Sequence, residues 1–154
     1  MGSGRHAVLL ADAGFSTFGV DIKPDAVRTA VRRAADRALV IHAWCADLTI
    51  YPLPTRAFAL VLVTRYLQRD LFPSIRHAVA PGGFVMYETF TVKQRALGTG
   101  PTSPDHLLEP GELKARFDTP SGAGKTAEFD VLFYEEVSGP EAVARIVARR
   151  TSSS

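Results

Sequence analysis

The stretch that decides the fold is residues 1–21, which read MGSGRHAVLLADAGFSTFGVD. Gly2 to Ala7 fit the pattern G-x-G-x-x-A, in which the glycines permit a tight turn and let backbone N–H groups approach a ligand. This turn leads into a predicted helix over 5–14, whose amino end favours negative charge. Asp21 closes the next predicted strand, at the spacing where a dinucleotide site places the carboxylate that accepts from ribose hydroxyls. The stretch therefore predicts a nucleotide-type cofactor site.

The rest of the chain alternates between predicted strands and helices. Alternation of this kind specifies a mainly parallel sheet with helices on both faces. The last two strands are joined by only SGPE, too short for a crossover, so we expect them to pair as an antiparallel hairpin. The predicted strands cover 16–21, 39–45, 58–67, 84–90, 128–137 and 142–150, and the predicted helices cover 5–14, 23–38, 70–80 and 109–117. Residues 81–83, Pro-Gly-Gly, are predicted as a turn, and 92–108 as the longest loop.

Side-chain burial is predicted from the same patterns. The helix over 23–38 has one apolar face, which comprises Val27, Val31, Ala34 and Ala38. The continuous apolar run FALVLV at 58–63 predicts a strand covered on both faces. We expect Trp44 to lie in the core, and the pair Arg149-Arg150 to be a solvated strand end.

Composition bounds the class of protein. With 154 residues, 46% of them hydrophobic and 22% charged, the chain suits one globular domain with a substantial core. The net charge of +2 is spread along the chain, which argues against a nucleic-acid partner. Cys45 is the only cysteine, so we expect a cytoplasmic protein without disulfides. No apolar run is long enough for a membrane span, and the histidines and Cys45 lack metal-ligand spacing.

Two cofactor classes use a glycine turn followed by an acidic strand end, namely nicotinamide dinucleotides and S-adenosylmethionine.

A separate pattern, GAGKT at 122–126, looks like the end of a phosphate-binding P-loop. The full P-loop pattern requires glycine at position 119, which is Thr119, and a helix precedes this stretch where a P-loop needs a strand. We therefore reject nucleotide hydrolysis.

The sequence resembles the class I S-adenosylmethionine-dependent methyltransferases, and most of all the small tellurite-resistance-type domains. The resemblance rests on GSGRHAVLLADAGFSTFGVD, the pair Asp47-Leu48, and FALVLVTRYL followed by HAVAPGGFVMYETF. It implies an α/β fold: a Rossmann-like, doubly wound, mainly parallel sheet that ends in a C-terminal antiparallel hairpin. A nicotinamide-binding Rossmann protein is the alternative, although it ordinarily lacks that hairpin.

The resemblance also implies roles for single residues in binding S-adenosylmethionine. Gly2 and Gly4 would line the methionine part of the cofactor, and Thr64 would sit beside its amino group. Asp21 would hold the ribose hydroxyls, and Ile22 would pack on the adenine. Asp47 would accept from the adenine amino group, while the backbone N–H of Leu48 meets the ring. Three of these residues have a simpler alternative role. Asp47 could be a turn cap, Ile22 a core residue, and Thr64 simply the end of a strand.

The acceptor is predicted to be a small molecule, held at the carboxyl ends of the strands. Methyl transfer from a sulfonium mainly needs positioning of the nucleophile. Arg65 and Tyr66 follow a predicted strand, and His6 lies on the glycine turn, so any of them could position a substrate. We take Arg65 and Tyr66 as the catalytic candidates, and predict no metal.

The family begins with a strand, usually after an amphipathic helix, that directly precedes the glycine turn. Here the turn stands at residue 2, so we expect residues 1–150 to be a methyltransferase domain that lacks its N-terminal helix and its first, central strand. The expected consequences are weak cofactor binding and marginal stability, in a monomer or homodimer. A non-catalytic remnant of the fold is a further alternative. Residues 151–154 are predicted to be a disordered tail.

Overall fold

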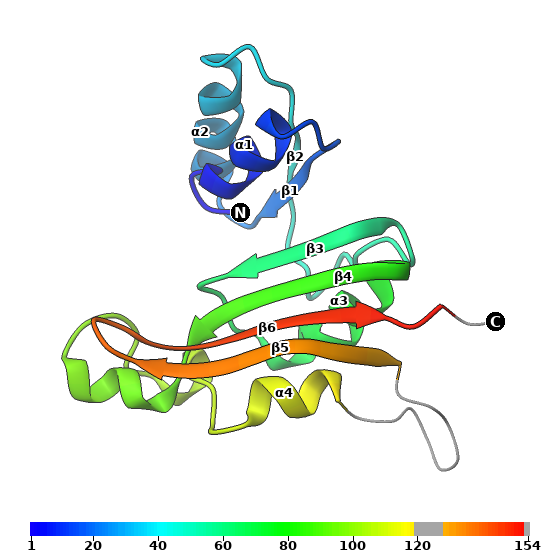
Figure 1. The fold of residues 1–154 in the computed structure, drawn as a ribbon. Helices are drawn as coiled ribbons and strands as arrows, with labels where there is room; N and C mark the ends of the chain where they lie inside the picture. Colours follow the sequence, from blue (N-terminus) through cyan, green and yellow to red (C-terminus); the bar gives the residue numbers. More distant parts are fainter. Residues whose placement is uncertain (119–127, 153–154) are drawn as a thin grey trace. The chain divides into compact units, whose positions relative to one another are not determined.

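The computed structural model describes residues 1–118 and 128–152, which form two compact units, Met1–Pro52 and Leu53–Ser154 (Figure 1). The GAGKT stretch lies outside the described residues. No helix of the described chain has both the length and the apolar character that crossing a bilayer requires.

The first unit contains two helices and two parallel strands. Its elements are α1 (Arg5–Asp12), β1 (Phe18–Asp21), α2 (Pro24–Ala35) and β2 (His42–Cys45). The predicted order of helix, strand, helix and strand is confirmed. Gly14 follows the end of α1 with φ 89°, the left-handed conformation that a glycine adopts without strain. β1 pairs with β2 in parallel, with Phe18 beside His42 and Asp21 beside Cys45.

The buried face of α2 differs from the predicted one. Ala30 and Ala34 are buried against α1 and Ile41, whereas Val31 is 44% exposed. The reason is the close approach of the chain, since a Cβ on Gly4 would lie 2.5 Å from the Cβ of Ala30. Small side chains therefore face α1. The helix also ends at Ala35, so that residue 38 lies beyond it.

The second unit contains a four-stranded sheet in the order β3-β4-β6-β5. The strands are β3 (Phe58–Thr64), β4 (Val79–Phe90), β5 (Phe129–Ser138) and β6 (Ala142–Arg150), and the helical elements are η1 (Arg69–Leu71), α3 (Phe72–Ala78), η2 (Val92–Leu97), η3 (Pro104–His106) and α4 (Glu112–Phe117). β3 and β4 are parallel, and β6 is antiparallel to both of its neighbours, β4 and β5. The predicted Rossmann-like α/β class and the C-terminal antiparallel hairpin are confirmed, although the strands form a two-stranded and a four-stranded sheet in place of one sheet.

The predicted Pro-Gly-Gly turn does not separate two elements, because residues 81–83 lie inside the strand β4. The pairing of β4 with β3 shifts between Phe58 and Leu60, and Gly82 has φ 74°. A Cβ on Gly83 would lie 2.9 Å from the carbonyl oxygen of Ala59. These glycines therefore form an irregularity inside the ladder, where the backbones approach more closely than a side chain allows.

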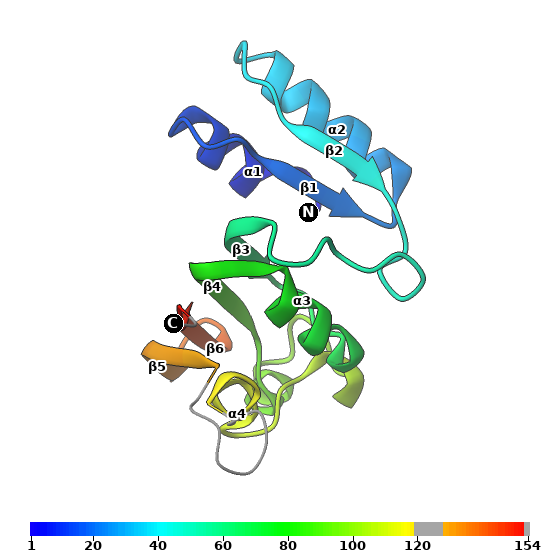
Figure 2. The ribbon, with the colours of Figure 1, turned by 90° about the vertical axis from the view of Figure 1, so that its right-hand side faces the viewer.

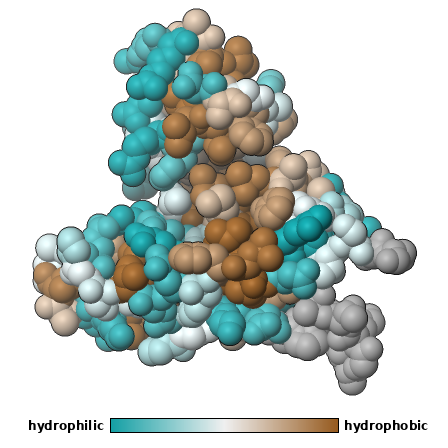
Figure 3. Space-filling model, viewed as in Figure 1, coloured by the Kyte–Doolittle hydropathy of each residue, from teal (hydrophilic) through white to brown (hydrophobic). Residues whose placement is uncertain are grey.

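Helices α3 and α4 lie on one side of the four-stranded sheet (Figure 2). Alternate residues of β4 and β6 are buried on this side, and the rings of Phe72, Tyr87, Phe117 and Phe129 form a chain of aromatic contacts. The other side carries exposed apolar side chains among charged ones (Figure 3). The prediction that β3 is covered on both faces is therefore not met, because its residues are partly buried or exposed.

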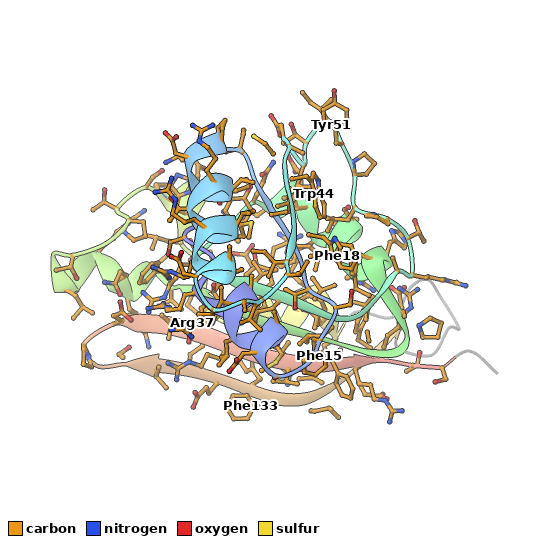
Figure 4. All side chains as sticks on the ribbon, turned by 90° about the horizontal axis from the view of Figure 1, so that it is seen from above. Phe15, Phe18, Arg37, Trp44, Tyr51 and Phe133 are labelled. Atoms are coloured by element: carbon orange, nitrogen blue, oxygen red, sulfur yellow. The ribbon has the colours of Figure 1, made fainter. Side chains whose placement is uncertain are left out.

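Two further burial predictions differ from the structure. Trp44, which is labelled in Figure 4, lies on β2 and is only partly buried. Arg150 is 8% exposed, and its guanidinium donates to Glu128 at 2.6 Å and to the carbonyl oxygen of Arg76 at 2.7 Å. The prediction of a solvated strand end is therefore wrong for Arg150, because partners on α3 and at residue 128 satisfy its charge. Thr151, in the segment predicted to be disordered, donates its backbone N–H to Glu128 O at 3.0 Å.

Candidate functional site

The glycine turn is held to the end of β1 by the carboxylate of Asp21. Its Oδ2 accepts from the backbone N–H of Gly2 at 2.8 Å and from the amino group of Met1 at 3.1 Å, and its Oδ1 accepts from the N–H of Lys23 at 3.0 Å. Burial works to raise the pKa of Asp21, but these donors outweigh it and lower the pKa. The carboxylate is therefore ionised at neutral pH and fixed beside the turn.

The two glycines of the turn have different local roles. Gly4 has φ 75° and packs directly against Ala30, so its lack of a side chain lets α1 approach α2. Gly2 has φ 54° and open space around it, since a Cβ there would meet nothing within 4 Å. Gly2 therefore presents backbone to solvent, as a ligand site requires, whereas Gly4 serves helix packing.

Asp47 caps the turn that follows β2. Its Oδ1 accepts from the backbone N–H of Thr49 at 2.9 Å and from the Thr49 hydroxyl at 2.6 Å, and these bonds lower the pKa of Asp47. Its carbonyl oxygen accepts from the N–H groups of Ile50 and Tyr51. Within the described chain, Oδ2 of Asp47 accepts no hydrogen bond and the N–H of Leu48 donates none. A carboxylate acceptor and a backbone donor thus stand side by side with capacity for a ligand.

The parallel pairing of β1 and β2 brings these groups to one end of the first unit. Ala46 N–H donates to Asp21 O at 3.1 Å, and Cys45 Sγ donates to Ile22 O at 3.3 Å. Asp21 and Asp47 therefore follow adjacent strands at their carboxyl ends. Ile22 is 60% exposed at the same end, so the alternative that it is a core residue is wrong. The structure brings Gly2, Asp21, Ile22, Asp47 and Leu48 into one neighbourhood.

Thr64, Arg65 and Tyr66 follow one another at the carboxyl end of β3 in the second unit. Arg65 has φ 55°, a conformation that costs a non-glycine residue free energy. Its guanidinium pairs with both oxygens of Glu141, contacts Glu88 and lies 4.7 Å from the ring centre of Phe90. The Glu141 hydrogen bonds are the largest cause that raises the pKa of Arg65. Arg65 thus joins the end of β3 to the β5–β6 turn.

Tyr66 is 47% exposed, its hydroxyl donates to Gln68, and its carbonyl oxygen accepts from Tyr87 at 2.8 Å. It lines a pocket of about 300 Å³, together with Leu67, Gln68, Arg69, Asp105 and His106. Sequence reasoning missed Asp105 and His106, which lie on η3 inside the predicted long loop. The one local signal was Ser103 before Pro104, a helix-cap pattern that the structure uses, since Ser103 Oγ accepts from Asp105 N–H. His6 lies in the first turn of α1.

Across the described ranges, no cluster of three or more histidine, cysteine, aspartate or glutamate side chains is arranged to hold a metal ion. The groups that fit a bound molecule are hydrogen-bonding groups and an exposed aliphatic surface. They suit an organic cofactor with hydroxyl and amino donors, such as a nucleoside.

Residues 1–83 match the family model described as "Methyltransferase domain". No curated protein matches this chain. Among solved structures, TehB from Haemophilus influenzae is similar at 15% identity with a TM-score of 0.76, over 97% of this chain and 55% of that one. An S-adenosylmethionine-dependent methyltransferase from Mesorhizobium loti is similar at 21% identity with a TM-score of 0.71, over 97% of this chain and 87% of that one.

The magnesium protoporphyrin IX methyltransferase of Synechocystis, solved with bound S-adenosylhomocysteine, is similar at 16% identity with a TM-score of 0.70, over 97% of this chain and 71% of that one. At these identities the solved structures show a common fold. The family model covers more than half of the chain and begins with the glycine turn. The chain therefore belongs to the methyltransferase-domain family and has the class I methyltransferase fold, whose methyl donor is S-adenosylmethionine.

Proposed function

We propose that this protein binds S-adenosylmethionine and transfers its methyl group to a small-molecule acceptor. The observation that carries the proposal is the meeting of Asp21, Ile22, Asp47 and Leu48 at one end of the β1–β2 pair. When bound, the cofactor supplies a methyl group activated by a sulfonium. The residues of this chain contribute binding and orientation.

The adenine would be recognised by three neighbouring groups of the first unit. Oδ2 of Asp47 would accept from the exocyclic amino group, the N–H of Leu48 would donate to a ring nitrogen, and the exposed side chain of Ile22 would cover one face. A hydrogen bond to a charged acceptor contributes roughly 1.5–3 kcal/mol. The ribose hydroxyls would donate to Asp21, whose carboxylate has about four lone-pair sites.

The methionine part would lie along the open backbone at Gly2. The role of Thr64 beside its amino group stays a prediction from the family resemblance. Gly4 would line the same part of the cofactor with its backbone, and its lack of a side chain also lets α1 pack against Ala30. Arg65 is proposed as a positioning residue, because it fixes the end of β3 through Glu141. Tyr66 is proposed to contact the acceptor, because it lines the pocket beside the same strand end.

Calorimetric titration with S-adenosylhomocysteine and with NADH tests the proposal. We expect saturable heat with S-adenosylhomocysteine, and affinity for it about 10- to 100-fold lower in Asp47→Asn, because the lost partner is a charged acceptor. Asp12→Asn, which changes the charge at an exposed position of the same unit, is the control and should bind normally. Binding of NADH without binding of S-adenosylhomocysteine would favour a nicotinamide-binding protein, and binding of neither by a cooperatively folded chain would favour a non-catalytic remnant.

A further inference from the structure

Tyr51 ends the turn that carries Asp47 and Leu48. Its backbone N–H donates to the carbonyl oxygen of Asp47 at 2.9 Å, and the N–H of Ile50 donates to the same oxygen at 3.1 Å. The whole turn lies inside the first unit. We propose that the ring of Tyr51 stacks on the adenine of the cofactor, which makes Tyr51 a further cofactor-binding residue. The inference rests on the proposed function, because it adds a residue to that site.

The backbone hydrogen bonds place Tyr51 on the same side of the turn as Asp47. Side chains four residues apart are neighbours on one helical turn, with Cβ atoms about 5–6 Å apart. An adenine that donates to Oδ2 of Asp47 and accepts from the N–H of Leu48 would hold one edge against this turn. Its two flat faces would remain open to side chains. The ring of Tyr51 is therefore within reach of one of these faces.

The exposure of Tyr51 favours a contact with a ligand. Tyr51 is 64% exposed, and Ile50, its neighbour on the turn, is 67% exposed. Ile22, which follows the end of the adjacent strand β1, is 60% exposed. Small-molecule sites combine apolar and aromatic side chains with a few polar groups that fix orientation. The carboxyl ends of β1 and β2 offer this combination.

Stacking, rather than a hydrogen bond from the hydroxyl, is the interaction that suits Tyr51. An aromatic side chain stabilises a base through its π-face, which phenylalanine and tyrosine share. Ile22 would cover the opposite face, so that the adenine lies between an aliphatic and an aromatic side chain. The contact involves the base and not the methionine part, so adenosine should depend on Tyr51 as strongly as S-adenosylhomocysteine does.

The first test compares the affinity of variants of the full chain for S-adenosylhomocysteine and for adenosine, measured by calorimetric titration. We expect Tyr51→Ala to bind both ligands about tenfold more weakly, and Tyr51→Phe to bind within about twofold of the wild type. Phe15→Ala is the matched control and should bind normally. Phe15 is an aromatic residue of the same unit, 56% exposed, that precedes β1 and lies at the other end of the unit from Tyr51 (Figure 4).

The second test needs no variant. Nuclear Overhauser effects between the adenine C–H protons and the Tyr51 ring protons are measured in the wild type with S-adenosylhomocysteine, and we expect them to be present. The inference is overturned if these effects are absent in a saturated complex, if Tyr51→Ala binds as tightly as the wild type, or if Phe15→Ala weakens binding equally. These outcomes leave the proposed function standing. A wild type that binds no S-adenosylhomocysteine would instead contradict the proposed function, and the inference with it.

Discussion

At the level of single residues, Glu112 is a carboxylate of the second unit that several donors hold. Its carboxylate pairs with Arg69 and Arg116 and also accepts from Glu109 N–H at 3.0 Å. Burial works to raise the pKa of Glu112, but the bonds from Arg69, Glu109 and Arg116 outweigh burial and lower the pKa to about 2. The side chain is 12% exposed, so solvent screens these interactions only in part.

This depressed pKa predicts a loss of stability in acid. The stabilisation is fully present above the unfolded value of 4.5 and is lost as the pH falls towards about 2. We expect this carboxylate to contribute roughly 2–3 kcal/mol to the free energy of unfolding at neutral pH. Urea denaturation of the wild type and of Glu112→Gln is measured at intervals of about one pH unit between roughly pH 6 and pH 2. The free energy of unfolding should depend less on pH in the variant than in the wild type. An equal pH dependence in both proteins would contradict the assignment.

A comparison of alanine substitutions at Gly4 and Gly14 separates the cost of overpacking from the cost of an unfavourable backbone conformation. Both have positive φ, of 75° and 89°, but a Cβ on Gly4 would meet Ala30 at 2.5 Å whereas one on Gly14 would meet nothing. We therefore expect Gly14→Ala to cost about 1–2 kcal/mol from conformation alone, and Gly4→Ala to cost at least about 1–3 kcal/mol more from overpacking. Chemical denaturation measures both, and equal costs would show that α1 does not depend on this close approach.

Single residues also show what the sequence could not predict. The spacing of Asp21 after the glycine turn predicted its position correctly, because strand and helix lengths fix where a strand ends. The same sequence could not predict that Gly4 contacts Ala30, since that contact joins two helices. Asp47 was predicted both as a ligand and as a cap, and the structure shows the cap while leaving one oxygen for a ligand.

At the level of elements, a largely buried cluster of charges connects the end of β6 to the end of α3. Glu128 accepts from Arg76 and Arg150, each at 2.6 Å, and the two guanidinium groups lie 5.7 Å and 5.9 Å from the ring centre of Phe129. The exposed fraction of the side chain is 20% for Glu128, 17% for Arg76 and 9% for Arg150. Removal of the carboxylate would leave two cations poorly solvated.

We expect Glu128→Gln to lower the free energy of unfolding by about 2–4 kcal/mol, since breaking a buried pair costs far more than breaking an exposed one. Glu135→Gln is the matched control, because its pair with Arg145 is more than a third exposed on both sides. The control should cost below about 1 kcal/mol. Thermal or urea unfolding measures both variants, and similar costs would contradict the structural role of Glu128.

Elements whose signal is local were predicted well. α3 begins with Phe72 and accepts Pro73 in its first turn, and the hairpin of β5 and β6 follows from its short connection. The Pro-Gly-Gly segment was predicted as a turn although it lies inside β4, because glycines mark both turns and close strand contacts, and only the position of Ala59 distinguishes these cases. The burial of Arg150 likewise depends on partners that lie far away in the sequence.

At the level of the whole molecule, the family and fold were predictable, whereas the pocket beside the end of β3 was not. The glycine turn, the strand ends and the hairpin occur in a fixed order along the chain, and this order identified the class I fold. The pocket depends on η3 meeting the segment after β3, two regions about 40 residues apart with no periodic pattern in the second. Long loops carry specificity in such folds, and their conformation is set by tertiary contacts.

The central claim is that an adenosine binds where β1 and β2 end. Backbone ¹H–¹⁵N NMR during titration with S-adenosylhomocysteine tests it most directly, because the method reports each amide and tolerates weak binding. We predict saturable shifts at Ile22, Asp47 and Leu48, with a large downfield change for the Leu48 amide proton as it gains a hydrogen bond, and much smaller shifts in Asp47→Asn at the same concentration. Saturation with no change at Leu48, or with shifts confined to the β5–β6 hairpin, would contradict the claim.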